Sequence, residues 1–228
     1  MAKKFSFPKY RDEMQKNLRT ASKGSGWKQS KGIVFRQSDD WFVAGHWRNV
    51  SSRLADGLKV EILAKPMAID PMLWETMGLE SNNSKPLSFR YWGAFTCGTP
   101  VILSETITET DPEIAPQAIL ARLNEMLPKL FVILATKKFS EIAKNPAGIH
   151  DNWKMNETIT QSLRLEQRPD LAIKFAKSAK SGMSVSKLVK DKARVGKSHN
   201  EILIDQLTTE PNQKGFLEKV LGKFIRTK

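Results

Sequence analysis

Cysteine is almost missing from this chain, since Cys97 is the only one. A single cysteine cannot form an intramolecular disulfide, so we expect a reducing, cytoplasmic setting. No local signature places a base beside Cys97, and its neighbours Thr96 and Gly98 are typical of a turn. We therefore interpret Cys97 as structural rather than catalytic.

Long hydrophobic runs are also missing. The longest candidate, Leu130–Ala135, is far too short to cross a bilayer. Near the N-terminus, Phe5-Ser6-Phe7-Pro8 does not form the apolar centre of a signal peptide. We expect neither a membrane-spanning segment nor secretion.

Recognisable metal and cofactor motifs are lacking as well. His46, His150 and His199 lie far apart, and none belongs to an HExxH, HxH or Cys/His spacing. We expect no metal and no cofactor. His46, which lies between Gly45 and Trp47, is the one histidine around which the sequence allows a catalytic site.

Two short resemblances to catalytic motifs fail on mechanism. Gly196-Lys197-Ser198 resembles the end of a phosphate-binding loop, but the glycine required five residues earlier is Asp191. Asp56, Glu61 and Lys65 suggest a metal-dependent nuclease. There the Glu and Lys lie two apart on one strand, whereas these lie four apart.

What the chain does contain is a clear hairpin pattern in Gly32–Arg48. β-branched and aromatic residues stand on both sides of Gln37–Asp40, a polar cluster that favours a reversal of the chain. Because an isolated hairpin is marginally stable, further strands and helices must pack on it. Leu58–Ala64 alternates apolar and polar residues, and Leu87–Phe95 and Pro100–Thr106 also favour strands.

Helical patterns surround these strands. We expect a helix from Pro8 to about Ala21 and a short helix Asp70–Met77, with Asp70 as N-cap and Gly78 closing it. A long helix should start at Thr110 and be kinked or broken by Pro128. A second helix over Lys129–Lys144 and a loop over Asn49–Gly57 complete this part. Further helical signals follow at Asn156–Glu166, Asp170–Ala179, Ser184–Arg194, Glu201–Leu207 and Gly215–Ile225.

The fold class that these patterns predict is α+β: an antiparallel sheet of about five strands packed by helices, followed by a basic, mostly helical C-terminal region. The composition changes after Gly148, where the content of aromatic residues falls. We therefore predict a core domain over residues 1–148 and a helical region over residues 149–228.

Positive charge is concentrated at the two ends. The net charge of +13 divides into +7 for residues 1–31, −2 for residues 32–167 and +8 for residues 168–228. Basic ends around a neutral middle are typical of proteins that meet an anionic partner. Lysines three apart on helical patterns can follow a phosphate backbone. The predicted nucleic-acid contacts are Lys174, Lys177, Lys180, Lys187, Lys190, Arg194 and Lys197.

Some short motifs resemble a group of uncharacterised bacterial proteins that contain a small α+β domain. They are Gly26-Trp27-Lys28 with Gly32–Arg36, Lys65-Pro66, and the Asp70, Trp74 and Gly78 pattern. The resemblance covers roughly residues 10–140. It implies a domain plan but no catalytic residue.

Three functional hypotheses follow. The leading one is a non-enzymatic cytoplasmic protein that binds an anionic partner, nucleic acid, through its basic ends. The second is a protein-interaction subunit of a bacterial multiprotein system, docking through a C-terminal apolar stripe. That stripe comprises Phe216, Leu217, Val220, Leu221 and Phe224. The third is an enzyme with a site assembled around His46.

Overall fold

The computed structural model describes residues 7–52, 55–147, 152–179 and 196–209. The chain forms two compact units that alternate along the sequence. The first unit takes Met1–Ala64 and Val101–Thr136, and the second takes Lys65–Pro100 and Lys137–Lys228. The predicted division between residues 148 and 149 lies in a segment outside the described residues and stays a prediction.

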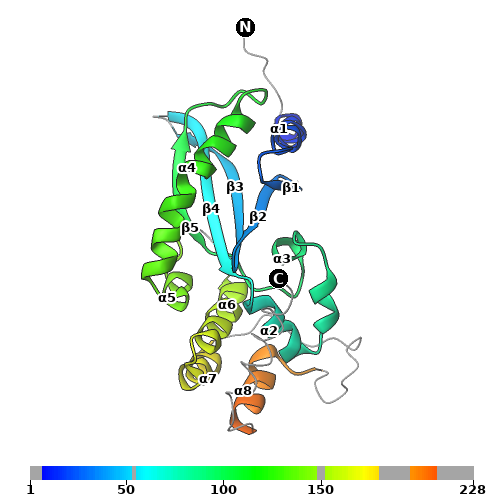
Figure 1. Cartoon of the computed structure of the whole chain (residues 1–228), viewed down its shortest axis with the longest axis vertical. Helices are drawn as coiled ribbons and strands as arrows, with labels where there is room; N and C mark the ends of the chain where they lie inside the picture. Colours follow the sequence, from blue (N-terminus) through cyan, green and yellow to red (C-terminus); the bar gives the residue numbers. More distant parts are fainter. Residues whose placement is uncertain (1–6, 53–54, 148–151, 180–195, 210–228) are drawn as a thin grey trace. The chain divides into compact units, whose positions relative to one another are not determined.

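The first unit contains an antiparallel sheet whose strands follow one another in chain order, β1-β2-β3-β4-β5 (Figure 1). An α+β fold with a five-stranded antiparallel sheet is therefore confirmed. The strands are β1 (Lys28–Ser30), β2 (Ile33–Ser38), β3 (Trp41–Ser52), β4 (Ala55–Pro66) and β5 (Val101–Ile107).

The hairpin of β2 and β3 forms where the sequence predicts it. Ser38 pairs with Trp41 across a turn at Asp39 and Asp40, and Asp39 has a positive φ of 49°. Short polar residues such as Asp tolerate this conformation better than others. The loop expected over Asn49–Gly57 is wrong, because β3 continues to Ser52 and β4 already starts at Ala55.

One predicted strand is also wrong. Leu87–Phe95 contains a short helix, α3 (Phe89–Trp92), which follows a turn in which Phe89 N–H donates to the carbonyl of Pro86. The fixed φ of proline favours such a turn. The fifth strand is instead β1, whose sequence Lys-Gln-Ser has none of the apolar alternation that marks a strand.

Two helices, α1 (Phe7–Ala21) and α4 (Ala115–Thr136), belong to the first unit and pack against each other. Along α4, Asn124 accepts a hydrogen bond from Trp27 beside β1, Leu123 lies against Gly45 of β3, and Arg122 pairs with Glu105 of β5. These contacts place α4 across one face of the sheet. Pro128 does not break the helix, since α4 continues through it, and the alternative expectation of a kink there stays a prediction.

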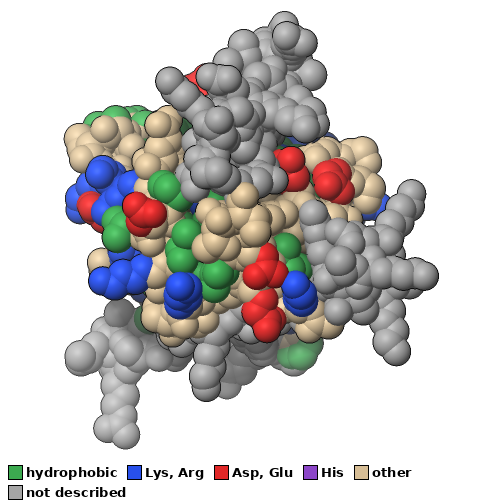
Figure 2. Space-filling view, turned by 90° about the horizontal axis from the view of Figure 1, so that it is seen from below, with side chains coloured by type: hydrophobic (Ala, Val, Ile, Leu, Met, Phe, Trp, Pro, Cys, Tyr) green, Lys and Arg blue, Asp and Glu red, His purple; other side chains and the backbone are tan. Residues whose placement is uncertain are grey.

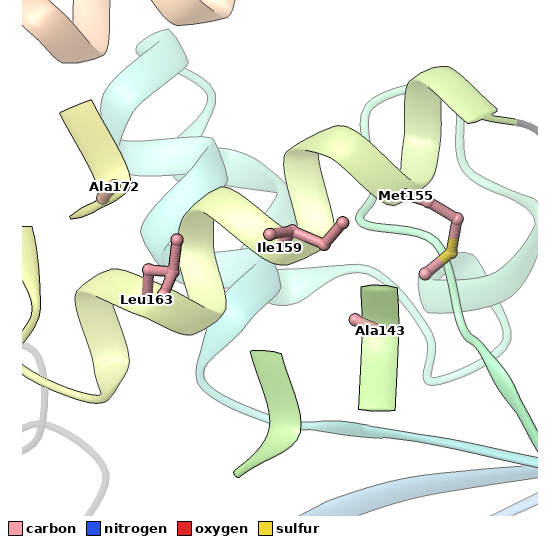
Figure 3. Packing of buried hydrophobic residues seen from close by; sticks show 5 residues of the cluster. All are labelled: Ala143, Met155, Ile159, Leu163 and Ala172. Atoms are coloured by element: carbon pink, nitrogen blue, oxygen red, sulfur yellow. The ribbon is translucent and has the colours of Figure 1, made fainter. Parts of the chain in front are cut away.

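The second unit is built from helices. Its elements are α2 (Ile69–Met77), the 3-10 helix η1 (Glu80–Ser84), α3, α5 (Phe139–Lys144), α6 (Asn152–Leu165), α7 (Pro169–Ser178) and α8 (His199–Thr209). Figure 3 shows the buried side chains of Met155, Ile159 and Leu163 along α6, with Ala143 of α5 and Ala172 of α7 beside them. The predicted helices Ser184–Arg194 and Gly215–Ile225 lie outside the described residues.

Asp70 does not cap α2 as the sequence predicts. The helix begins at Ile69, and the residue at the N-cap position is Ala68, which makes no side-chain capping bond. Asp70 lies in the first turn with its carboxylate fully buried among other partners. At the other end the prediction is confirmed: Gly78 closes the helix in the left-handed conformation, with φ 72°.

Candidate functional site

Only part of the predicted nucleic-acid interface lies within the described residues. Lys174 and Lys177 are exposed on α7, opposite the buried Ala172 and Ala176. Lys197 is exposed and its ammonium lies 2.8 Å from the carboxylate of Asp205. The other predicted contacts lie outside the described residues, and they are Lys180, Lys187, Lys190 and Arg194.

The predicted partner-binding stripe also lies outside the described residues. It consists of Phe216, Leu217, Val220, Leu221 and Phe224. A docking role for this stripe therefore stays a prediction.

A row of cations that the sequence prediction did not select runs along α1. Met14 and Leu18 are fully buried on one side of the helix. Positions seven apart return to nearly the same side of an α-helix, and the exposed Lys9 and Lys16 follow that spacing. The exposed cations of this row, called the α1 row below, are Lys9, Lys16 and Arg19 of the helix and Lys23, which lies in the turn two residues beyond its end.

Not every face of the molecule concentrates one sign of charge. On the described part of the face in Figure 2, Lys and Arg side chains alternate with Asp and Glu. A surface of mixed sign attracts a polyanion weakly. The α1 row differs, because Asp12 is the only exposed acidic residue of α1.

A second polar cluster lies on the sheet. Gly45 and Trp47 of β3 point toward the helices, since Gly45 lies against Leu123 and the Trp47 ring is 6.3 Å from that of Tyr10 in α1. Successive strand residues alternate between faces, so His46 and Arg48 point to the opposite face.

Glu61 on the neighbouring strand β4 gathers three basic side chains. Its carboxylate lies 3.6 Å from His46 Nδ1, 3.4 Å from Arg48 Nε and 3.7 Å from Lys59 Nζ. Glu61 is only 8% exposed, whereas the side chains of His46 and Arg48 are 38% and 45% exposed. We call these four residues the sheet cluster. The structure thus brings His46 to an acidic residue of the sheet.

The protonation of His46 reflects this environment. Burial lowers the pKa of His46 below its ordinary value of 6.5. The Glu61 carboxylate opposes that shift and raises the pKa, while the Arg48 guanidinium lowers it further.

Lys65, one residue of the rejected nuclease pattern, belongs to a buried ion-pair network. Lys65 is fully buried, and its ammonium donates to Asp70 Oδ1 at 2.9 Å and to the carbonyls of Arg90 and Cys97 at 2.7 Å. Asp70 also accepts from the Arg90 guanidinium and from the Cys97 N–H. Lys65 is therefore saturated by protein groups.

Cys97 belongs to the same network and has the character of a structural residue. It is 1% exposed, and its thiol lies 3.7 Å from the carbonyl of Ile69. Burial, with the Asp70 carboxylate nearby, raises the pKa of the thiol well above 9.0. Since the thiolate is the nucleophilic form, this environment suppresses reactivity.

His199, the third histidine of interest, is buried in the second unit. Its ring contacts the carboxylate of Glu157 on α6, and its Nε2 lies 2.7 Å from Gln161 Nε2. Gln161 in turn accepts a hydrogen bond from Arg164. Both His199 and Glu157 are fully buried, so this pair holds α8 against α6 rather than facing a substrate.

Comparisons add no functional assignment. In the described ranges, no group of three or more His, Cys, Asp or Glu residues is arranged to hold a metal ion, and no helix there combines the length and apolarity needed to cross a bilayer. No protein-family model, no curated protein and no solved structure matches the chain.

Proposed function

We propose that this protein binds nucleic acid, as a non-enzymatic protein, through its basic terminal regions. The α1 row is the observation that carries the proposal. Its cations point outward while Met14 and Leu18 anchor the opposite side of the helix in the core of the first unit. The packing of the helix therefore fixes the positions from which these positive charges face the solvent.

The dimensions of α1 suit a polyanion. Its 15 residues span about 22 Å, and Lys9 and Lys16 lie about 10 Å apart along the axis. Duplex DNA carries one charge per about 1.7 Å of its length, so each cation of the row can neutralise a phosphate without reading a base. The expected binding is strong at low salt and largely independent of sequence.

Lys174 and Lys177 supply the C-terminal part of the proposed interface. They are exposed and three apart on α7, so they project from similar sides of that helix. Asp170, in the first turn, is the acidic residue of α7. The charged residues of the later turns are all lysines, so that part of the helix is positively charged. Lys197, which pairs with Asp205, is expected to contribute less.

The test is binding of a fluorescent 20-base-pair DNA measured by anisotropy over a range of salt concentrations. The triple variant K16E/R19E/K23E should lose most of its affinity. Its log–log salt slope should fall by about one for each lost phosphate contact. The variant K174E/K177E tests the C-terminal part in the same way.

A matched control separates specific contacts from net charge. The triple variant K85E/K137E/K144E changes the charge equally at exposed lysines outside the proposed interface. It should retain most of the affinity. The proposal is wrong if the wild type does not bind, if binding does not depend on salt, or if both triple variants lose affinity equally.

The protein-interaction hypothesis makes a different prediction. A partner docked on the stripe from Phe216 to Phe224 would copurify in fixed stoichiometry and survive nuclease treatment. Under our proposal, nuclease should instead lower the ratio of absorbance at 260 nm to that at 280 nm and release no protein partner.

A further inference from the structure

The sheet cluster contains a second group of basic side chains, separate from the α1 row, that an anion can approach. Arg48 and Lys59 carry permanent positive charges, and Glu61 balances only one of them. One positive charge is therefore left unbalanced on a partly exposed surface of the sheet, where the Arg48 side chain is 45% and the Lys59 side chain 27% exposed. The acid is the buried member and the cations are the accessible ones.

The distances within the cluster are longer than those of strong ion pairs. Arg48 Nε and Nη2 both lie 3.4 Å from the same oxygen of Glu61, and Lys59 Nζ lies 3.7 Å away. Charge-assisted hydrogen bonds are usually about 2.7–2.9 Å long. Glu61 thus orients the two cations from the buried side of the cluster. The N–H groups of Arg48 and Lys59 can still donate hydrogen bonds to an added anion.

The neighbouring positions of the sheet add hydrogen-bonding groups. His46 lies on the same face as Arg48, with Nδ1 toward Glu61. In β5, Thr106 pairs directly with Lys59 and is exposed. Directly opposed residues of antiparallel strands point to the same face. A guanidinium, an ammonium, an imidazole and a hydroxyl therefore surround one patch.

We propose that this patch, formed by Arg48, Lys59, His46 and Thr106 over the buried Glu61, is a binding site for a phosphate-type oxyanion. Guanidinium and ammonium groups suit tetrahedral oxyanions, and the planar Arg fork can engage two oxygens at once. The anion is either a free phosphate or monoester, or a backbone phosphate of nucleic acid. The site does not depend on the α1 row.

The test is an NMR titration of the full-length protein at constant pH and ionic strength. The His46 ring, Arg48 Nε–H and Lys59 side-chain signals are followed while inorganic phosphate replaces chloride. Adenosine 5′-monophosphate and a twelve-base oligothymidine without terminal phosphate are the further probes. Saturable shifts with phosphate or the monophosphate identify a small-molecule site, and shifts with the oligothymidine alone identify a backbone contact.

The variant R48Q/K59Q should bind the effective probe at least about tenfold more weakly, because each removed cation deletes a charge-assisted hydrogen bond. If the double variant is unstable, the single variant K59Q is measured instead, because it keeps Arg48 beside Glu61. The matched control is K16Q/K23Q, which removes equal charge from the α1 row of the same unit. This control should lose DNA affinity yet keep the sheet site.

The inference is overturned if no probe shifts the signals of His46, Arg48 and Lys59 in the wild type. It is also overturned if R48Q/K59Q binds within about twofold of the wild type. Failure of DNA binding by the α1 row would refute only the proposed function. The two proposals therefore fail separately.

Discussion

Lys65 and Asp70 form an ion pair that is completely shielded from water: Nζ lies 2.9 Å from the carboxylate and neither side chain is exposed. The Arg90 guanidinium lies 3.1 Å from the same carboxylate. One buried acid thus serves two cations and the Cys97 amide. The network ties the end of β4, the start of α2 and the segment around Cys97 together within the second unit.

Replacing Asp70 with Asn should destabilise the second unit by about 3–5 kcal/mol, because two buried cations lose their counter-charge. The measurement is urea denaturation followed through intrinsic tryptophan fluorescence, to which Trp74, buried in α2, contributes. The control D40N changes an exposed acid at the hairpin turn and should cost less than about 0.5 kcal/mol. A loss below about 1 kcal/mol for D70N would contradict the prediction.

Gly45 is required for the contact between β3 and α4. A Cβ there would lie 2.9 Å from Val34 Cγ2 and overlap Leu123 Cδ1. We expect Gly45→Ala to destabilise the first unit by about 1–3 kcal/mol through overpacking. The variant Leu123→Ala removes the obstructing side chain, so the Gly45→Ala penalty should shrink in that background. Additive effects in this double-mutant cycle, measured by chemical denaturation, would refute the contact.

His46 should titrate below 6.5 in the native protein, because burial is the largest influence on its pKa. NMR titration of the ring C–H signals measures this, with the urea-unfolded chain as reference. E61Q should lower the midpoint further and R48Q should raise it. As the pH falls, the unfolded chain takes up its proton first. The stability contributed by this group is therefore complete above about 6.5 and lost as the pH falls through the native pKa.

Cys97 should be inert in the folded protein. Its burial and raised pKa leave almost no accessible thiolate at neutral pH. Titration with a thiol-specific chromogenic disulfide should give a negligible reaction with native protein and one thiol per chain in guanidinium. Rapid stoichiometric reaction of the native protein would show that the thiol is accessible.

Local patterns predicted local structure well. β-branched and aromatic residues on both sides of a polar turn located the hairpin, apolar alternation located β4, and the helix-ending Gly78 helped to locate α2. The errors have long-range causes. Asp70 has the sequence signature of an N-cap, but its partners Lys65, Arg90 and Cys97 are brought to it by the fold.

The sheet cluster could not be predicted from the sequence for the same reason, because its residues come from different strands. His46 and Glu61 become neighbours through the pairing of β3 with β4, and the loop expected over Asn49–Gly57 concealed that pairing. The α1 row, in contrast, could have been selected from the sequence. Lys9, Lys16 and Lys23 recur every seven residues beside a helical apolar stripe.

The interleaving of the two units has a consequence for biosynthesis. The first unit lacks β5 and α4 until the ribosome has delivered Thr136, and by then Lys65–Pro100 has already emerged without the helices it packs with. Folding vectorially from the N-terminus therefore leaves that intervening stretch without its packing partners until α6 and α8 have been synthesised. No single cut in the gene yields either unit intact.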